Sequence, residues 1–273
     1  DNHVNPVKIE PSIRFAVHFL KYPQDIYPSE SVAHPVNPAK SCYPVMNREI
    51  LKLAIPNIIS NISVPLLSSV DTALMGQLSA LHIGAVGVGS MLFNFIYWNF
   101  GFLRMGTTGI TAQNYGQQSD SAIILTLGRA LFIAVILAIL IMILQVPFAE
   151  IGFSLMNLSE AQLPLVATYF YIRIWAAPAT LTLYALMGWF FGMQNAIYPL
   201  ILTITINVVN IICSLFFIKY WGFEVAGVAY GTVIAQYVGL FLALGLFFYK
   251  YRYLLPHSSQ KAILKWTELR QFL

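Results

Sequence analysis

The chain has 273 residues, of which 58% are apolar and only 10% are charged, and its mean hydropathy is +0.70. A soluble globular domain carries about 25% charged residues, so this composition argues against a water-soluble enzyme. An apolar run of about 20 residues can cross a bilayer as a helix. Residues 130–149, 174–218 and 225–249 contain no charge at all. The sequence therefore predicts an all-α polytopic membrane protein.

The net charge of +4 and the two cysteines, Cys42 and Cys213, add little chemistry. Two cysteines are too few for a disulfide framework and support no metal site. Loop lysines and arginines orient membrane proteins, so we interpret the charge as topology and expect no nucleic-acid partner. The sequence has no phosphate-binding loop, no HExxH, no nucleophile elbow and no CxxC. It thus predicts neither an enzyme nor a bound cofactor.

The first 45 residues differ in composition from the rest. They hold half of the prolines, the chain starts at Asp1, and its first methionine is Met46. The segment also lacks the order of a signal peptide. We expect residues 1–45 to be disordered or non-native, with Met46 as the natural initiator.

From Met46 onward the apolar pattern predicts a transmembrane lobe over residues 46–250. Polar turn residues at Gln194, Asn195 and Pro199 divide the longest uncharged stretch in two. Six spans follow, at about 50–75, 83–107, 122–146, 163–189, 198–220 and 226–249. Residues 251–273 mix apolar and charged positions as an interfacial amphipathic helix would, and we expect them to form a cytoplasmic linker.

An even number of spans places both ends of the lobe on one side of the bilayer. Arg48 and Lys52 precede the first span, and basic residues follow the last, whereas the opposite loops offer mainly acids. The positive-inside rule then predicts that both ends are cytoplasmic. We expect the protein in the plasma (inner) membrane.

One acid lies inside a predicted span. A carboxylate at mid-helix costs about 2.5–3.5 kcal/mol on insertion scales, so intramembrane acids are functional candidates. Asp71 lies about five residues from the outer end of span one, hence roughly 8 Å below the outer boundary. The alternative is a carboxylate that simply reaches the outer interface.

Span five carries a polar stripe. Asn207, Asn210 and Ser214 are spaced by three and four, which places them on one helical face. The stripe is either interhelical glue or a set of cation ligands, and spacing alone does not decide. Because Ser214 and Thr232 lie at about the same depth as Asp71, we hypothesise a coupling-ion site for a proton or Na⁺ built from Asp71, Asn207, Asn210, Ser214 and Thr232.

Two further features concern movement and charge. Pro56 lies inside span one, where proline favours a kink; it is either a hinge or simply tolerated.

Arg104 and Arg129 lie near cytoplasmic ends and can snorkel. Arg173 lies near mid-bilayer, where it either pairs with Asp71 or provides the charge of a water-filled cavity.

Three segments carry a family resemblance. LAIPNIISNISVPLLSSVDTALMGQL (53–78), FNFIYWNFGFLRMGTTGITAQNYGQ (93–117) and INVVNIICSLFFIKYWGFEVAGVAYGTVIAQY (206–237) resemble the amino-terminal lobe of a multidrug and toxic compound extrusion (MATE) transporter of the DinF-like branch. The resemblance implies twelve spans in two lobes, export of small organic compounds driven by proton or sodium entry, and a missing carboxy-terminal lobe as partner.

The same resemblance implies roles for particular residues. The family's cation site falls on Asp71, Asn210, Ser214 and Thr232, and its bending proline falls on Pro56. The second acid of the family pattern is Ser214 here, which modestly favours a proton over sodium. Two alternatives stay open, namely a flippase for lipid-linked or anionic substrates and a transport-inactive membrane scaffold.

Overall fold

The computed structural model describes residues 51, 54–56, 58–59 and 79–257, which belong to one compact unit, Met46–Leu273. Several predictions lie outside the described residues. They are the segment 1–45, most of the first span with Asp71, and the amphipathic segment after residue 257.

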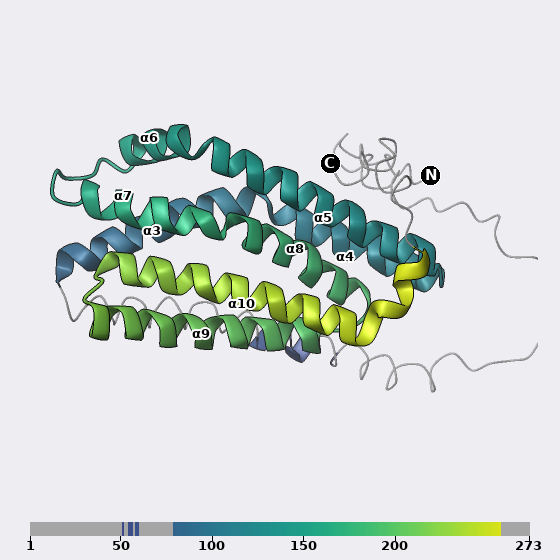
Figure 1. The fold of residues 1–273 in the computed structure, drawn as a ribbon. Coiled ribbons are helices and arrows are strands. Elements are labelled where there is room, and N and C mark those ends of the chain that lie inside the picture. Colours follow the sequence, from purple (N-terminus) through teal and green to yellow (C-terminus); the bar gives the residue numbers. More distant parts are fainter. Residues whose placement is uncertain (1–50, 52–53, 57, 60–78, 258–273) are drawn as a thin grey trace, which may run out of the picture. The chain divides into compact units, whose positions relative to one another are not determined.

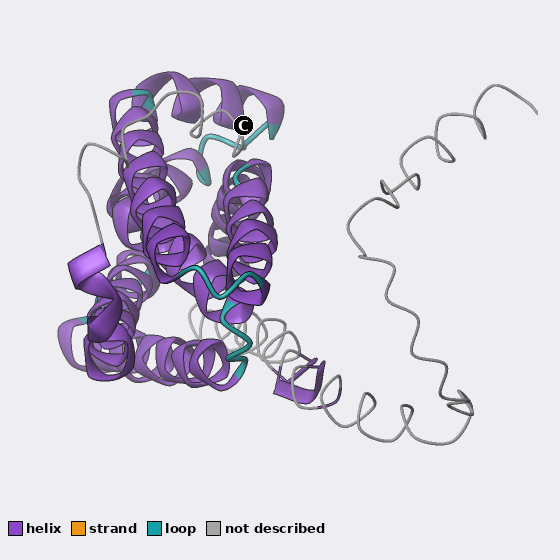
Figure 2. Cartoon of the chain, turned by 90° about the vertical axis from the view of Figure 1, so that its right-hand side faces the viewer, coloured by secondary structure: helices purple, strands orange, loops and turns teal. Residues whose placement is uncertain are grey.

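The described part is helical from end to end and contains no strand (Figures 1 and 2). Five of its segments are long and apolar enough to cross a membrane, and each covers one of the predicted spans two to six. The all-α membrane fold is thus confirmed. The α-helices are α3 (Ala80–Asn99), α4 (Gly101–Gly116), α5 (Asp120–Ile143), α6 (Gln145–Leu155), α7 (Leu163–Arg173), α8 (Ala177–Gly192), α9 (Ile197–Trp221) and α10 (Val225–Tyr251), and the 3₁₀ helices are η1 (Ile174–Ala176) and η2 (Arg252–His257).

Antiparallel neighbours hold the lobe together. The α9–α10 hairpin lies along one side, while α3 and α4 pack against α7 and α8 and α5 packs against α8 (Figure 1). The α6–α7 loop and the α9–α10 turn lie at one end, and the α4–α5 and α8–α9 turns lie at the other. Each span thus crosses the full length of the lobe.

Two of the spans change geometry near their middle. Span two breaks at Phe100, between α3 and α4, and span four tightens into η1 after Arg173. Pro178, at the start of α8, explains the second change because proline offers no N–H to continue the helical ladder.

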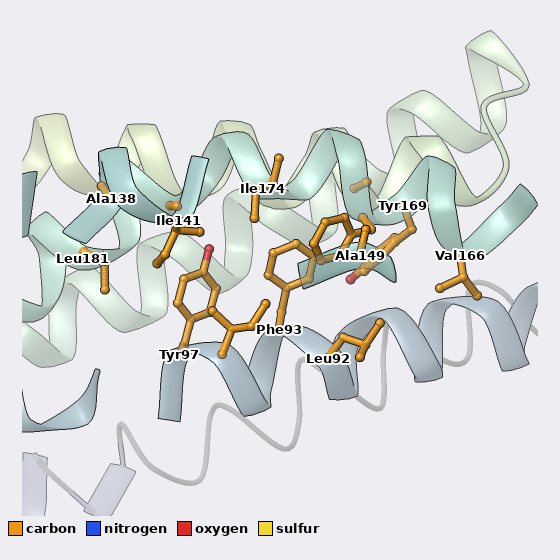
Figure 3. Close-up of a cluster of buried hydrophobic side chains, with 14 of the residues drawn as sticks. Leu92, Phe93, Tyr97, Ala138, Ile141, Ala149, Val166, Tyr169, Ile174 and Leu181 are labelled. Carbon is orange, nitrogen blue, oxygen red and sulfur yellow. The ribbon is translucent and has the colours of Figure 1, made fainter. Parts of the chain in front are cut away.

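Aromatic side chains fill the core between α3 and α7 (Figure 3). Phe93 stacks on Phe170 at a ring-centroid distance of 5.1 Å and meets the edge of Tyr169 at 6.5 Å. The ring of Tyr97 continues this stack, 5.8 Å from Phe93. These contacts fix α3 against α7 at the level of the span breaks.

A second core lies where α5, α8 and α10 meet. Trp189 is fully buried there, and its indole N–H donates to the carbonyl of Ile123 at 3.1 Å. Its ring lies 4.9 Å from that of Tyr251. This cluster holds α8 in place, and α8 forms a wall of the cavity described below.

The observed boundaries differ from the predicted ones mainly around polar turns. The second span runs on to Gly116, and α6 appears where only a loop was expected. Gln194 and Asn195 do lie in the turn between α8 and α9, as predicted. Gly222 ends α9 with a φ of +66°, a left-handed conformation that glycine adopts readily.

Candidate functional site

The polar stripe of α9 faces α10 inside the hairpin. Asn210 and Thr232 are buried, with 2% and 8% of their surfaces exposed. The amide nitrogen of Asn210 donates to the Thr232 hydroxyl at 2.9 Å, and that hydroxyl donates to the carbonyl of Val228 at 3.0 Å. The side chain of Asn210 also carries a carbonyl oxygen, a ligand type that suits small cations.

Ser214 lies one turn further along the same face and is fully buried. Its hydroxyl has no hydrogen-bond partner among the described residues. A Cβ atom on Gly231 would lie 2.3 Å from this hydroxyl, so α9 and α10 touch here through a glycine. The close approach leaves a buried hydroxyl in a tight, neutral crossing.

The other predicted site residues are placed less completely. Asn207 is half-buried on α9, one helical turn before Asn210. Pro56 is helical and half-buried. Asp71, the predicted ion-binding acid, lies outside the described residues. Among those residues, no group of three histidines, cysteines or acids could hold a metal ion.

A separate cavity of about 910 Å³ lies between α3–α4 and α8. Arg104 is its one charged residue among the described residues that line it. Trp98 and Met105 lie at its exposed rim, with 82% and 79% of their surfaces accessible. The lining comprises Ala54, Tyr97, Trp98, Gly101, Arg104, Met105, Thr108, Gly109, Ala112, Tyr184, Phe191 and Gln194.

Close contacts between α4 and α8 fix the backbone of Arg104 beside the cavity. A Cβ atom on Gly188 would lie 2.5 Å from the backbone oxygen of Arg104, so α4 and α8 cross in close contact. The Thr108 hydroxyl bridges the crossing, at 2.9 Å from the Arg104 carbonyl oxygen and 3.0 Å from that of Gly188. The guanidinium carbon lies 5.2 Å from the ring centre of Phe191.

Arg173 has quite different surroundings. Its guanidinium donates to the Ser90 hydroxyl at 3.1 Å and to the Tyr169 hydroxyl. It also lies 5.0 Å from the ring centre of Phe93. Arg173 is therefore held between α3 and α7 and does not line the 910 Å³ cavity. The cavity charge that the sequence suggested at Arg173 is provided there by Arg104, to which the sequence suggested a snorkelling role.

The sequence did not predict a polar contact at the end of the lobe that carries the α9–α10 turn. His82, in the first turn of α3, lies 2.6 Å from the carboxylate of Glu224 and 2.6 Å from the Ser79 hydroxyl. Ser79 also caps α3 by accepting from the backbone N–H of His82. The serine at the start of the span is the signal for the cap, but nothing in the spacing signals Glu224, which is 142 residues away.

Comparison of the sequence with known proteins identifies a family and several relatives. The MatE family model matches residues 56–216. DNA damage-inducible protein F of Escherichia coli is 38% identical over 199 residues, which are 72% of this chain and 43% of that protein. A probable multidrug resistance protein NorM of Bacillus subtilis is 25% identical over 111 residues, 41% of this chain and 25% of that protein. The chain thus spans less than half the length of these relatives.

Solved structures share the fold. An outward-facing multidrug resistance MATE family transporter of the MOP superfamily superposes with a TM-score of 0.74 at 23% identity, over 82% of this chain and 50% of that one. The Vibrio cholerae MATE transporter VcmN in its bent form gives 0.73 at 20% identity, over 84% and 51%. Helix order, the matched family model and these superpositions agree, and the chain belongs to the MatE family of membrane transporters.

Proposed function

We propose that this chain forms the amino-terminal lobe of a cation-coupled efflux transporter, in which proton or sodium entry drives export of small organic compounds. The observation that carries the proposal is the buried contact of Asn210 with Thr232 beside the buried Ser214 hydroxyl. Polar groups buried inside a membrane lobe are expensive and therefore functional candidates. Family membership supports the transport activity.

In this mechanism Asp71 takes up and releases the coupling ion, with oxygen atoms of Asn207, Asn210, Ser214 and Thr232 as further ligands. Pro56 lets span one bend when the charge of Asp71 changes. Cargo lies between this lobe and a second lobe of the same protein, and both ends of the present lobe are cytoplasmic. Because the ion enters while the cargo is exported, the two move in opposite directions through a cleft with alternating access.

Transport driven by an imposed gradient tests the proposal. The full-length transporter that contains this lobe is reconstituted in liposomes, and dye export is measured under a proton gradient or a sodium gradient. Asp71→Asn and Asn210→Leu should each abolish gradient-driven export because they remove ion ligands, and the protein should stay folded, with at most the small loss of stability that one hydrogen bond implies in Asn210→Leu. Retained export in both variants would remove the site from the mechanism, and export driven by only one gradient identifies the ion.

The chain offers a matched control for Asn210. The Asn114 amide nitrogen on α4 donates to the Thr126 hydroxyl on α5 at 2.9 Å, a similar interhelical pair far from α9. Asn114→Leu should leave gradient-driven export intact. Equal loss in Asn114→Leu and Asn210→Leu would mean that both amides serve packing alone, as the scaffold alternative requires.

A flippase for lipid-linked or anionic substrates is a second candidate, which the cationic lining of the cavity favours. Movement of a labelled anionic lipid between leaflets, measured in the same liposomes, separates it from export of soluble compounds.

A further inference from the structure

The cavity beside α4 has a charge that the described residues do not neutralise. Arg104 makes no ion pair with any described residue, and its guanidinium contacts the face of Phe191. No acid is among the described lining residues. A cation in a membrane protein is stabilised by a carboxylate or another anion, by carbonyls or by water, so an anion bound in this cavity would meet an oppositely charged group in Arg104.

The position of Arg104 is set by the packing of α4 against α8. The crossing at Gly188 fixes the backbone of Arg104 against α8, so the guanidinium stays at the cavity.

The rest of the lining suits a planar apolar body. Four aromatic residues contribute to it, and apolar atoms dominate its surface. They are Tyr97, Trp98, Tyr184 and Phe191. Ligand sites of about 300–1,000 Å³ typically combine apolar walls with a few polar groups that fix orientation. A volume of 910 Å³ with one guanidinium fits this description.

We infer that this cavity is a binding subsite for amphipathic anions, in which Arg104 binds a carboxylate, sulfonate or phosphate and the aromatic residues hold an apolar body. Guanidinium pairs with such groups through charge-assisted, often bidentate hydrogen bonds. The inference rests on the proposed transport function, because it assigns a class of cargo to the transporter. It involves none of the described residues of the proposed ion site, which lie on α9 and α10.

Equilibrium binding without any gradient tests the subsite, so its failure is distinct from failure of ion coupling. The probes are 1-pyrenesulfonate and 1-pyrenemethylammonium, which share a ring system and differ in charge. Energy transfer from tryptophan to pyrene reports binding to the full-length transporter in nanodiscs of phosphatidylcholine. Trp98→Phe should reduce the transfer, because Trp98 lies at the cavity rim.

The expected result is tighter binding of the sulfonate than of the ammonium probe. Arg104→Gln should weaken sulfonate binding about tenfold, the equivalent of 1.4 kcal/mol, and should not weaken ammonium binding. Arg104→Lys keeps the positive charge but loses the bidentate guanidinium, so its sulfonate affinity should lie between those of the wild type and Arg104→Gln. Arg173→Gln is the matched control and should bind both probes as the wild type does.

Equal wild-type affinity for both probes would overturn the inference, as would unchanged sulfonate binding in Arg104→Gln or an equal loss in Arg173→Gln. Nanodiscs with phosphatidylglycerol separate two sources of the anion. Weaker sulfonate binding there in the wild type, but not in Arg104→Gln, supports the subsite and identifies a lipid phosphate as its occupant. Equal affinity in both lipids supports the subsite as one for free organic anions.

Discussion

The α9–α10 hairpin and the cavity beside α4 are both polar regions within an apolar lobe, yet they are built in opposite ways. In the hairpin, Asn210, Ser214 and Thr232 are neutral, buried and closely packed. In the cavity, Arg104 is charged, half-buried and surrounded by aromatic residues. A closed neutral crossing suits a small ion, whereas an open cationic cavity suits an organic molecule. In the proposed mechanism, the two tasks of a coupled transporter therefore fall on different helices.

The largest loss of stability is expected from a substitution at the contact between α4 and α8, which form the cavity wall. In Gly188→Ala the new Cβ would lie 2.5 Å from the Arg104 backbone oxygen, and because backbone cannot swing aside, α4 and α8 must separate. We expect a loss of about 3 kcal/mol, the upper part of the usual range for overpacking, measured as a lower melting temperature in detergent. Gly106→Ala on the same α4 meets no atom within 4 Å and should be neutral. An equal loss in both variants would contradict the account.

The hairpin should respond to the same kind of change somewhat less. Gly231→Ala would place a Cβ 2.3 Å from the Ser214 hydroxyl, which can rotate in part, and 2.9 Å from the Ser214 backbone nitrogen, which requires a small shift of the helix. We expect a loss of about 2 kcal/mol together with lost gradient-driven export and unchanged pyrenesulfonate affinity. Gly245→Ala, on the same helix with open space around it, is the control. Normal export in Gly231→Ala would show that the crossing is not part of the ion site.

Some parts of the fold could be predicted from the sequence and others could not. Spans two to six were predictable because uncharged runs and polar turns fix where a helix enters and leaves the bilayer. The α6 helix was missed because it is too short to span, and the extension of α4 to Gly116 was missed because the residues after 107 are largely polar and do not continue the apolar run. Asn114, in this extension, donates its amide to Thr126 on α5.

The candidate site residues on α9 could also be predicted from the sequence, whereas the cavity could not. Helical spacing placed Asn210 and Ser214 on one face, since period and depth are local properties. The cavity depends on how α4 crosses α8 at Gly188, and no local pattern reports such a crossing. For the same reason the sequence did not predict that Arg104 lines this cavity.

A smaller loss of stability is expected when an interhelical hydrogen bond is removed, either in the α9–α10 hairpin or between α4 and α5. Thr232→Val removes the acceptor of the Asn210 amide at 2.9 Å. We expect a loss of about 1 kcal/mol, since interhelical bonds in membranes average about 0.6 kcal/mol and an unsatisfied buried amide costs more. Thr126→Val removes the equivalent acceptor of Asn114 and should cost a similar amount. Chemical unfolding in mixed micelles measures both, and only Thr232→Val should also alter gradient-driven export.

The smallest expected effect concerns the pair of His82 and Glu224 at the far end of the lobe. The contact is 2.6 Å long, but Glu224 is 56% exposed, and exposed ion pairs contribute about 0–1 kcal/mol. His82→Gln should therefore shift the melting temperature by only a degree or two, as about 0.5 kcal/mol implies. A large loss of stability, or of either transport activity or probe binding, would show that this contact belongs to one of the two regions.

The central claim is that ion coupling and cargo binding use separate residues, and one paired measurement tests it most directly. Pyrenesulfonate affinity without a gradient and gradient-driven export are measured side by side for Asn210→Leu and Arg104→Gln. The account predicts that Asn210→Leu keeps the affinity and loses the drive, and that Arg104→Gln loses affinity while export of an uncharged dye stays gradient-driven. Loss of probe affinity in Asn210→Leu equal to that in Arg104→Gln would contradict it.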